Sequence, residues 1–94
     1  MALKTFPFDA ADALDTPEEQ AALLAEAFAS GEAEIVTAAL GIIARARGIA
    51  QVARDTGLSR EALYKATSPD GNPTLATLLS ILKVTGLKLS ASVR

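Results

Sequence analysis

The spacing of apolar residues predicts a long amphipathic helix early in the chain. The apolar positions that recur at helical spacing are Leu23, Leu24, Ala27 and Phe28. Thr16, Pro17 and Glu19 mark its start, because a threonine N-cap, a first-turn proline and a glutamate at the third position make a capping box. We expect the helix to stop at Ser30 and Gly31. Its apolar stripe should lie in the core, although it could instead bind a partner protein.

A second helix is predicted from about Glu32 to Arg47, and its apolar face is wide enough for deep burial. The apolar residues on this face are Ile35, Val36, Ala39, Leu40, Ile42, Ile43 and Ala46. Gly41 costs a helix about 1 kcal/mol relative to alanine, which favours close helix packing there. Arg45 and Arg47 lie in the last turn, where they suit the helix dipole, so we expect a structural role rather than phosphate contact. Gly48 ends the helix.

Residues 50–66 predict two short helices that meet at a tight corner. The first spans 50–56, and Gly57 can adopt the positive φ that ends it. Leu58 should point inward, and Ser59 can cap the second helix. The outward face of that helix carries Arg60, Glu61, Tyr64 and Lys65. This pattern is typical of the helix-turn-helix of DNA-binding proteins.

Turn-forming residues at 67–73 separate this corner from a last predicted helix, which Thr74 caps and Gly86 ends. Its apolar residues are Leu75, Leu78, Leu79, Ile81, Leu82 and Val84. Residues 87–93 then alternate apolar and polar at period two, which predicts a β-strand.

A lone strand is unstable, so the predicted strand needs a partner. Residues 1–8, which have some extended character, could supply it. The same strand of a second copy could do so instead and would make a homodimer. Between these segments, Asp9 could cap a single helical turn that ends at Leu14.

Composition narrows the fold and excludes much chemistry. Half of the 94 residues are apolar but only four are aromatic, which favours a compact all-α domain of four to five helices. The chain has no cysteine and no histidine, so thiolate chemistry and the commonest metal ligand are absent. No phosphate-binding glycine motif occurs. We therefore expect no enzyme, no catalytic residue, no metal site and no cofactor.

The chain has no apolar run approaching the about 18 residues of a membrane span, and its N-terminus lacks a signal-peptide pattern. We expect no membrane association and a cytoplasmic location.

Charge divides the chain into two unequal parts. Residues 1–34 hold one basic and eight acidic groups, a net charge of −7. Residues 35–94 hold eight basic and three acidic groups, a net charge of +5. The division suggests two differently charged partner surfaces. The division is also compatible with a purely structural role, in which acidic side chains near helix N-termini stay solvated and interact favourably with the helix dipole.

The segments Val52–Ala66 and Asp70–Thr74 resemble the signature of the probable addiction-module antidote proteins. Met1–Thr5, Pro7–Asp9 and Gly86–Leu89 are similar to the ends of that family. These are small antitoxins of the HigA type, in the Xre and lambda-repressor-like helix-turn-helix group. The resemblance implies a lambda-repressor-like fold and a prokaryotic antitoxin that neutralises a RelE/ParE-like toxin from the same operon. It also implies a homodimer that binds and represses its own promoter.

The candidate DNA contacts follow from the second helix of the corner, whose N-terminal part would lie in the major groove. Arg60 suits a bidentate contact to guanine, and Glu61 can accept from cytosine N4. Tyr64 and Lys65 would reach base methyls or the backbone, and Ser59 with the helix N-terminus suits a phosphate. Two residues at the start of the next helix and one in the first helix of the corner complete the set: Asn72, Thr74 and Gln51.

Two functions compete at this stage. In the first, residues 1–31 form an acidic toxin-binding segment with one helix, and residues 32–94 form a domain that binds double-stranded operator DNA. In the second, the protein is a helical interaction module that sequesters a partner without sequence-specific DNA binding. The second is favoured by the small basic surplus of residues 48–66, which hold three basic and two acidic groups.

Overall fold

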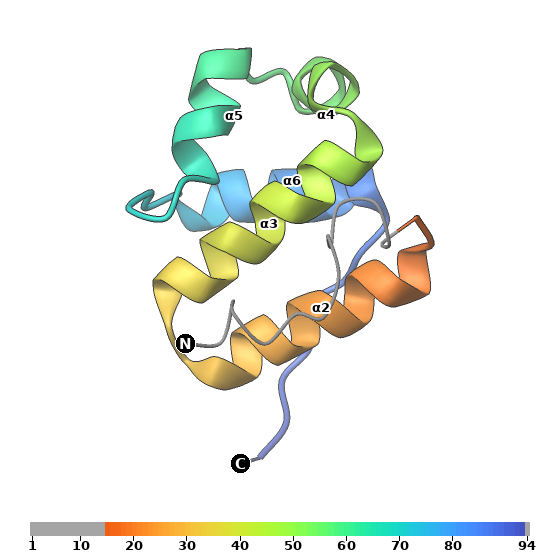
Figure 1. The fold of residues 1–94 in the computed structure, drawn as a ribbon, viewed down its shortest axis with the longest axis vertical. Helices are drawn as coiled ribbons and strands as arrows, with labels where there is room; N and C mark the ends of the chain where they lie inside the picture. The colour runs from red at the N-terminus through yellow and green to blue at the C-terminus, as the bar shows by residue number, and fades with distance from the viewer. Residues whose placement is uncertain (1–14, 94) are drawn as a thin grey trace.

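The computed structural model describes residues 15–93, which form five helices joined by short loops (Figure 1). They are α2 (Pro17–Ser30), α3 (Ala33–Arg47), α4 (Ile49–Thr56), α5 (Arg60–Ala66) and α6 (Leu75–Thr85). The prediction of an all-α fold is confirmed for this part of the chain. The extended segment expected at 1–8 and the turn at 9–14 lie outside the described residues.

The start of α2 is the capping box that the sequence predicts. The Thr16 hydroxyl accepts a hydrogen bond from the Glu19 amide at 3.2 Å, and the Glu19 carboxylate accepts one from the Thr16 amide at 3.3 Å. Gly31 ends the helix with a φ of 73°. The apolar stripe of α2 is buried through Leu23, Leu24 and Ala27, so it belongs to the core.

The core runs through all five helices, with α3 at its centre. Its fully buried aliphatic side chains are Leu40, Ile43, Leu63 and Ile81. Figure 1 shows α6 crossing behind α3, with α4 and α5 at one end of the molecule and α2 at the other. The helix of the acidic segment therefore shares one core with the helices that follow it.

Gly41 allows the close approach expected in α3, but the neighbour is a loop rather than a helix. A Cβ atom on Gly41 would lie 3.2 Å from the carbonyl oxygen of Thr67, which follows α5. Because Gly41 has no side chain, the backbone that follows α5 can pack closely against α3.

Arg47, in the last turn of α3, forms hydrogen bonds with residues of two other helices. Its position in the sequence does not indicate these bonds. Its Nε donates to Oε1 of Gln20 in α2 at 2.8 Å, and its guanidinium also donates to the carbonyl oxygen of Thr85 in α6. Gln20 and Thr85 are 2% and 1% exposed. The structural role expected for Arg47 therefore extends beyond the helix dipole to holding α2 and α6 on α3.

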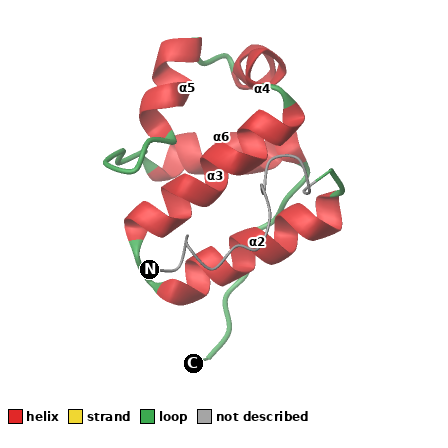
Figure 2. Cartoon of the chain, viewed as in Figure 1, coloured by secondary structure: helices red, strands yellow, loops and turns green. Residues whose placement is uncertain are grey.

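The predicted C-terminal strand is wrong for residues 87–93. Figure 2 shows no strand in the described part of the chain. Gly86 ends α6 in the left-handed conformation, and the Leu87 amide donates back to the Leu82 carbonyl at 2.9 Å. Beyond Leu87, the tail meets no extended segment among residues 15–93 with which it could form a ladder. Period-two alternation alone does not make a strand without a hydrogen-bonding neighbour.

Between residues 15 and 93, no single helix is long and apolar enough to cross a membrane. Helices α3 and α4 reach that length and composition only together, and they are bent by 103° at Gly48.

Candidate nucleic-acid interface

The α4–α5 corner is built as its sequence predicts. Gly57 ends α4 with a φ of 79°, a conformation that glycine adopts without a Cβ penalty. Leu58 is half-buried and packs against the core, and the Ser59 hydroxyl caps α5 by accepting from the Ala62 amide at 3.0 Å. Leu63 and Ala66 anchor α5 in the core. These contacts fix the direction in which α5 presents its other side chains.

Thr56 has a role in the corner that sequence analysis missed. Its hydroxyl donates to the Val52 carbonyl at 2.8 Å and accepts from the Leu58 amide at 3.2 Å. The Leu58 amide, just after the end of α4, therefore has a hydrogen-bond acceptor. A threonine at the end of a helix can bond in this local way, so the residue type was a usable signal.

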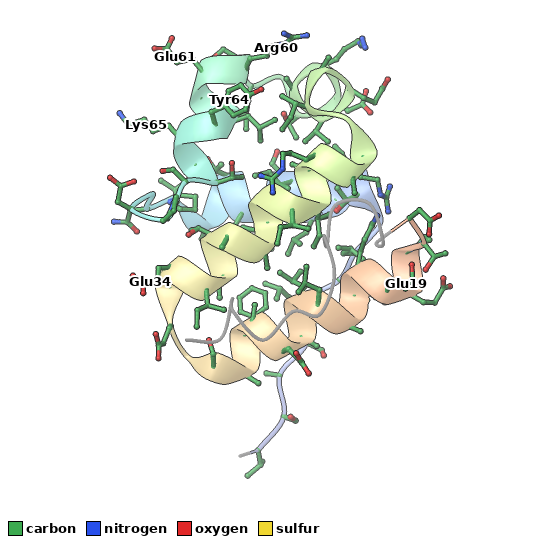
Figure 3. All side chains as sticks on the ribbon, in the orientation of Figure 1. Glu19, Glu34, Arg60, Glu61, Tyr64 and Lys65 are labelled. Carbon is green, nitrogen blue, oxygen red and sulfur yellow. The ribbon has the colours of Figure 1, made fainter. Side chains whose placement is uncertain are left out.

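The exposed face of α5 carries four side chains in two pairs, 60 with 64 and 61 with 65, and the members of each pair lie one helical turn apart. All four residues are exposed, and Tyr64 is 55% exposed although it is aromatic. Figure 3 shows Arg60 and Glu61 projecting from the outer end of α5 and Lys65 from its side, at the end of the molecule away from α2. The structure thus places the four main candidate contacts together on one surface, the α5 face.

Gln51 lies on the exposed side of α4, but its amide is already engaged. It donates to the Asp55 carboxylate at 2.9 Å and accepts from the Arg54 guanidinium at 3.5 Å. A ligand contact by Gln51 would have to compete with these bonds.

The remaining candidates are Ser59, which caps α5, and Asn72 and Thr74, which precede α6. A groove of about 450 Å³ there is lined by Lys65, Asn72 and Thr74, which brings three of the predicted contacts together. Thr74 caps α6 as predicted, since its hydroxyl accepts from the Thr77 amide at 3.1 Å. The same hydroxyl also donates to Oγ1 of Thr77 at 3.1 Å, so its proton is used within the helix. The Ser59 hydroxyl forms no such second bond within residues 15–93.

The groove holds its shape because Gly71 sits where no side chain fits. A Cβ atom on Gly71 would lie 2.4 Å from the carbonyl oxygen of Lys65, closer than any real contact. The Asp-Gly pair indicated only a turn, so this close approach could not be predicted from the sequence.

Charge is separated along the molecule. Residues 15–34, which include α2, hold six acidic groups and no basic one. Figure 3 shows Glu19 and Glu34 in the half of the molecule that is away from the α5 face. We call residues 15–34 the acidic pole. Among residues 15–93, no three acidic side chains are grouped so that they could hold a metal ion.

Residues 15–93 thus form a small all-helical fold with the polar α5 face at one end and the acidic pole at the other. Residues 4–93 match the model of the family described as "Probable addiction module antidote protein". The chain is 47% identical over 81 residues to an uncharacterized protein of Haemophilus influenzae strain Rd, an alignment that covers 86% of this chain and 84% of that protein. No solved structure matches the chain.

The protein belongs to the family of probable addiction module antidotes. Membership indicates an antitoxin role and, in general, a toxin as partner.

Proposed function

We propose that this protein is the antitoxin of a type II toxin–antitoxin module that neutralises a RelE/ParE-like toxin and represses its own operon. Repression would use the α4–α5 corner, residues 50–66, as a helix-turn-helix. The observation that carries the DNA-binding part is the α5 face. Its four long side chains are exposed on a helix that Leu63 and Ala66 anchor in the core.

In this proposal α5 enters the major groove with its N-terminal end toward the base edges. Arg60 makes a bidentate contact to guanine, and Glu61 accepts from cytosine N4. Tyr64 meets thymine methyls, and Lys65 binds backbone phosphate together with Asn72 of the neighbouring groove. Loss of one bidentate pair lowers affinity about ten- to hundredfold.

The test of DNA binding is a fluorescence-anisotropy titration with the duplex upstream of the operon and a scrambled duplex, at two salt concentrations. We expect tight binding to the upstream duplex only, weakening as salt rises, because phosphate contacts release counterions. The double variant Arg60→Ala/Lys65→Ala should lose this binding. Lys83→Ala/Lys88→Ala removes the same charge away from the α5 face and should retain it. Equal losses in both variants would argue against a specific role of the α5 face.

The acidic pole is the proposed toxin-binding surface. A ribonuclease-like toxin of this type is basic because it binds RNA, so an acidic surface would complement its charge and speed their encounter. Deleting residues 1–31 would also remove Leu23, Leu24 and Ala27 from the core, so substitution is the cleaner test.

We expect the triple variant Glu18→Gln/Glu26→Gln/Glu34→Gln to bind toxin more weakly, with a smaller salt dependence. Its DNA binding should be unchanged. Glu61→Gln/Asp70→Gln changes acids outside the acidic pole and serves as the control for toxin binding. Unchanged toxin affinity in the triple variant would refute the assignment of this surface.

One observation keeps an interaction module without DNA binding as the second candidate. The corner carries a net charge of only +1 over residues 48–66, and Asp70 lines the groove beside Lys65. Under this alternative, Arg60→Ala/Lys65→Ala would have no DNA binding to lose and toxin neutralisation would persist. Both candidates place the protein in the cytoplasm.

A further inference from the structure

A groove of about 600 Å³ lies between α2 and the C-terminal tail, and we call it the tail groove. Its large lining residues are apolar: Leu24, Phe28, Leu87 and Leu89. Leu24 is buried, Phe28 and Leu87 are half-buried against the core, and Leu89 is 38% exposed. Figure 1 shows the tail passing α2 at the end of the molecule away from α5. An occupant of the tail groove therefore leaves the α5 face accessible.

Small residues of α2 keep the tail groove open. Ala21, Ala25 and Ala29 line it at intervals of four residues, and all three are exposed. Residues spaced by four lie on one face of a helix, so the three alanines form a stripe about 12 Å long. Because no side chain on this stripe extends beyond Cβ, a large apolar side chain from outside can reach Leu24 and Phe28.

The tail adds a polar edge to this apolar groove. Within residues 15–93, the last backbone–backbone hydrogen bond along the chain joins the Leu87 amide to the Leu82 carbonyl. The backbone of the residues that follow is therefore available to a ligand, and Ser90 and Ser92 line the groove beside it. An apolar centre with a polar rim is the usual composition of a protein–protein interface.

Charge indicates which kind of protein fits the tail groove. The groove runs along the acidic pole, whose six acidic residues are all exposed. Glu18 lies one turn before Ala21, and Glu26 follows Ala25 directly. Lys88 is the one basic residue among the described residues that line the groove. A complementary partner is therefore basic around the apolar side chains that it inserts.

We propose that the tail groove holds large apolar side chains of the toxin, on a segment in which lysine or arginine flanks them. This inference rests on the proposed function and deepens its toxin-binding surface, since the acidic pole attracts the toxin and the tail groove retains it. Exposed rim charges mainly set the association rate, whereas apolar anchors buried in a pocket mainly set the dissociation rate.

Other occupants match the charge of this surface less well. A second copy that met the first through α2 would oppose six acidic groups with six, which is repulsive. Residues 1–14 of the same chain hold one basic and two acidic groups, so they do not complement the acidic pole.

The test is a surface-binding measurement of association and dissociation rates, with the full-length chain immobilised and the toxin from the same operon as analyte. Ala25→Trp fills the tail groove from an exposed position. The matched control Ala22→Trp places the same side chain on an exposed position of α2 that does not line the groove. We expect Ala25→Trp to raise koff about thirtyfold, as loss of a hot spot does, with little change in kon. Ala22→Trp should change koff less than about threefold.

Leu89→Ser separates loss of an apolar contact from blocked access, because it removes an exposed apolar side chain instead of adding a bulky one. We expect it to raise koff several-fold. The triple glutamine variant of the acidic pole should instead lower kon and its salt dependence. All of these variants should bind the upstream duplex as the wild type does and melt within a few degrees of it.

Equal effects of Ala25→Trp and Ala22→Trp on koff would overturn the inference. So would a loss in Ala25→Trp with none in Leu89→Ser, since that result indicates blocked access alone. If Ala25→Trp leaves the toxin kinetics unchanged but abolishes self-association in sedimentation, the occupant is a second copy. If it leaves them unchanged but lowers the melting temperature by more than a few degrees, the occupant is residues 1–14. Either result overturns the inference.

The same measurement distinguishes failure of this inference from failure of the proposed function. A wild-type chain that does not bind the toxin refutes the proposed function. A wild-type chain that binds the toxin, with a koff that Ala25→Trp does not change, refutes the role of the tail groove and leaves the proposed function in place.

Discussion

Replacing Arg47 by methionine tests whether the bonds between α2, α3 and α6 stabilise the fold. Arg47→Met keeps an unbranched apolar stem in the half-buried position but removes the bonds to Gln20 and to the Thr85 carbonyl. A hydrogen bond to a charged group contributes about 1.5–3 kcal/mol, and some of this loss is offset by relief of desolvation. We expect the free energy of unfolding to fall by about 3 kcal/mol.

The matched control is Arg45→Met, because Arg45 lies in the same last turn of α3 but is exposed. If both arginines served only the helix dipole, each replacement would cost about 0.3–1 kcal/mol. The bonds seen in the structure predict a much larger loss for Arg47 alone.

Thermal and urea unfolding followed by circular dichroism measure the difference. For a domain of this size, 3 kcal/mol corresponds to a fall in melting temperature of about 12–24 °C. Equal and small losses in the two variants would refute the reasoning. A double-mutant cycle with Gln20→Met should give a coupling of more than about 0.5 kcal/mol.

Two further substitutions test the corner and its groove. Gly71→Ala should destabilise the fold and disturb the groove, because its Cβ would lie 2.4 Å from the Lys65 carbonyl oxygen. Gly41→Ala should lower the stability less, because its Cβ would lie 3.2 Å from its nearest neighbour. A lower melting temperature for Gly41→Ala than for Gly71→Ala would contradict this. Thr56→Val should lower the free energy of unfolding by about 1 kcal/mol in urea, because the Leu58 amide loses its acceptor. A gain in stability would show that an aliphatic residue suits this position better.

Local features of the fold could be predicted from the sequence because they depend on neighbours three or four residues apart. Thr16, Ser59 and Thr74 each cap the helix they were expected to cap. The burial of α3 also followed from its apolar spacing. The prediction of a C-terminal strand was wrong for the opposite reason. A strand needs a hydrogen-bonding partner, and the alternation of apolar and polar residues does not show whether one is present.

The long-range contacts were out of reach of such reasoning. Arg47 bonds to residues 27 and 38 positions away, and nothing in its local sequence distinguishes it from Arg45. At the candidate interface, the exposure of Arg60, Glu61, Tyr64 and Lys65 followed from helical spacing. That Gln51 and Thr74 are engaged by neighbouring side chains did not, because each could equally have faced solvent.

The shared core has a consequence for how the protein would be removed from a cell. Leu23 and Leu24 of α2 belong to the same buried cluster as Leu63 of α5, so the two ends of the molecule unfold together rather than one at a time. Under the proposed function, proteolysis that begins at either end would therefore leave no fragment that binds DNA without binding toxin, or toxin without DNA. Under the proposed function, degradation would free the toxin and open the operon in the same event, so that synthesis of new antitoxin starts as soon as the old supply is lost.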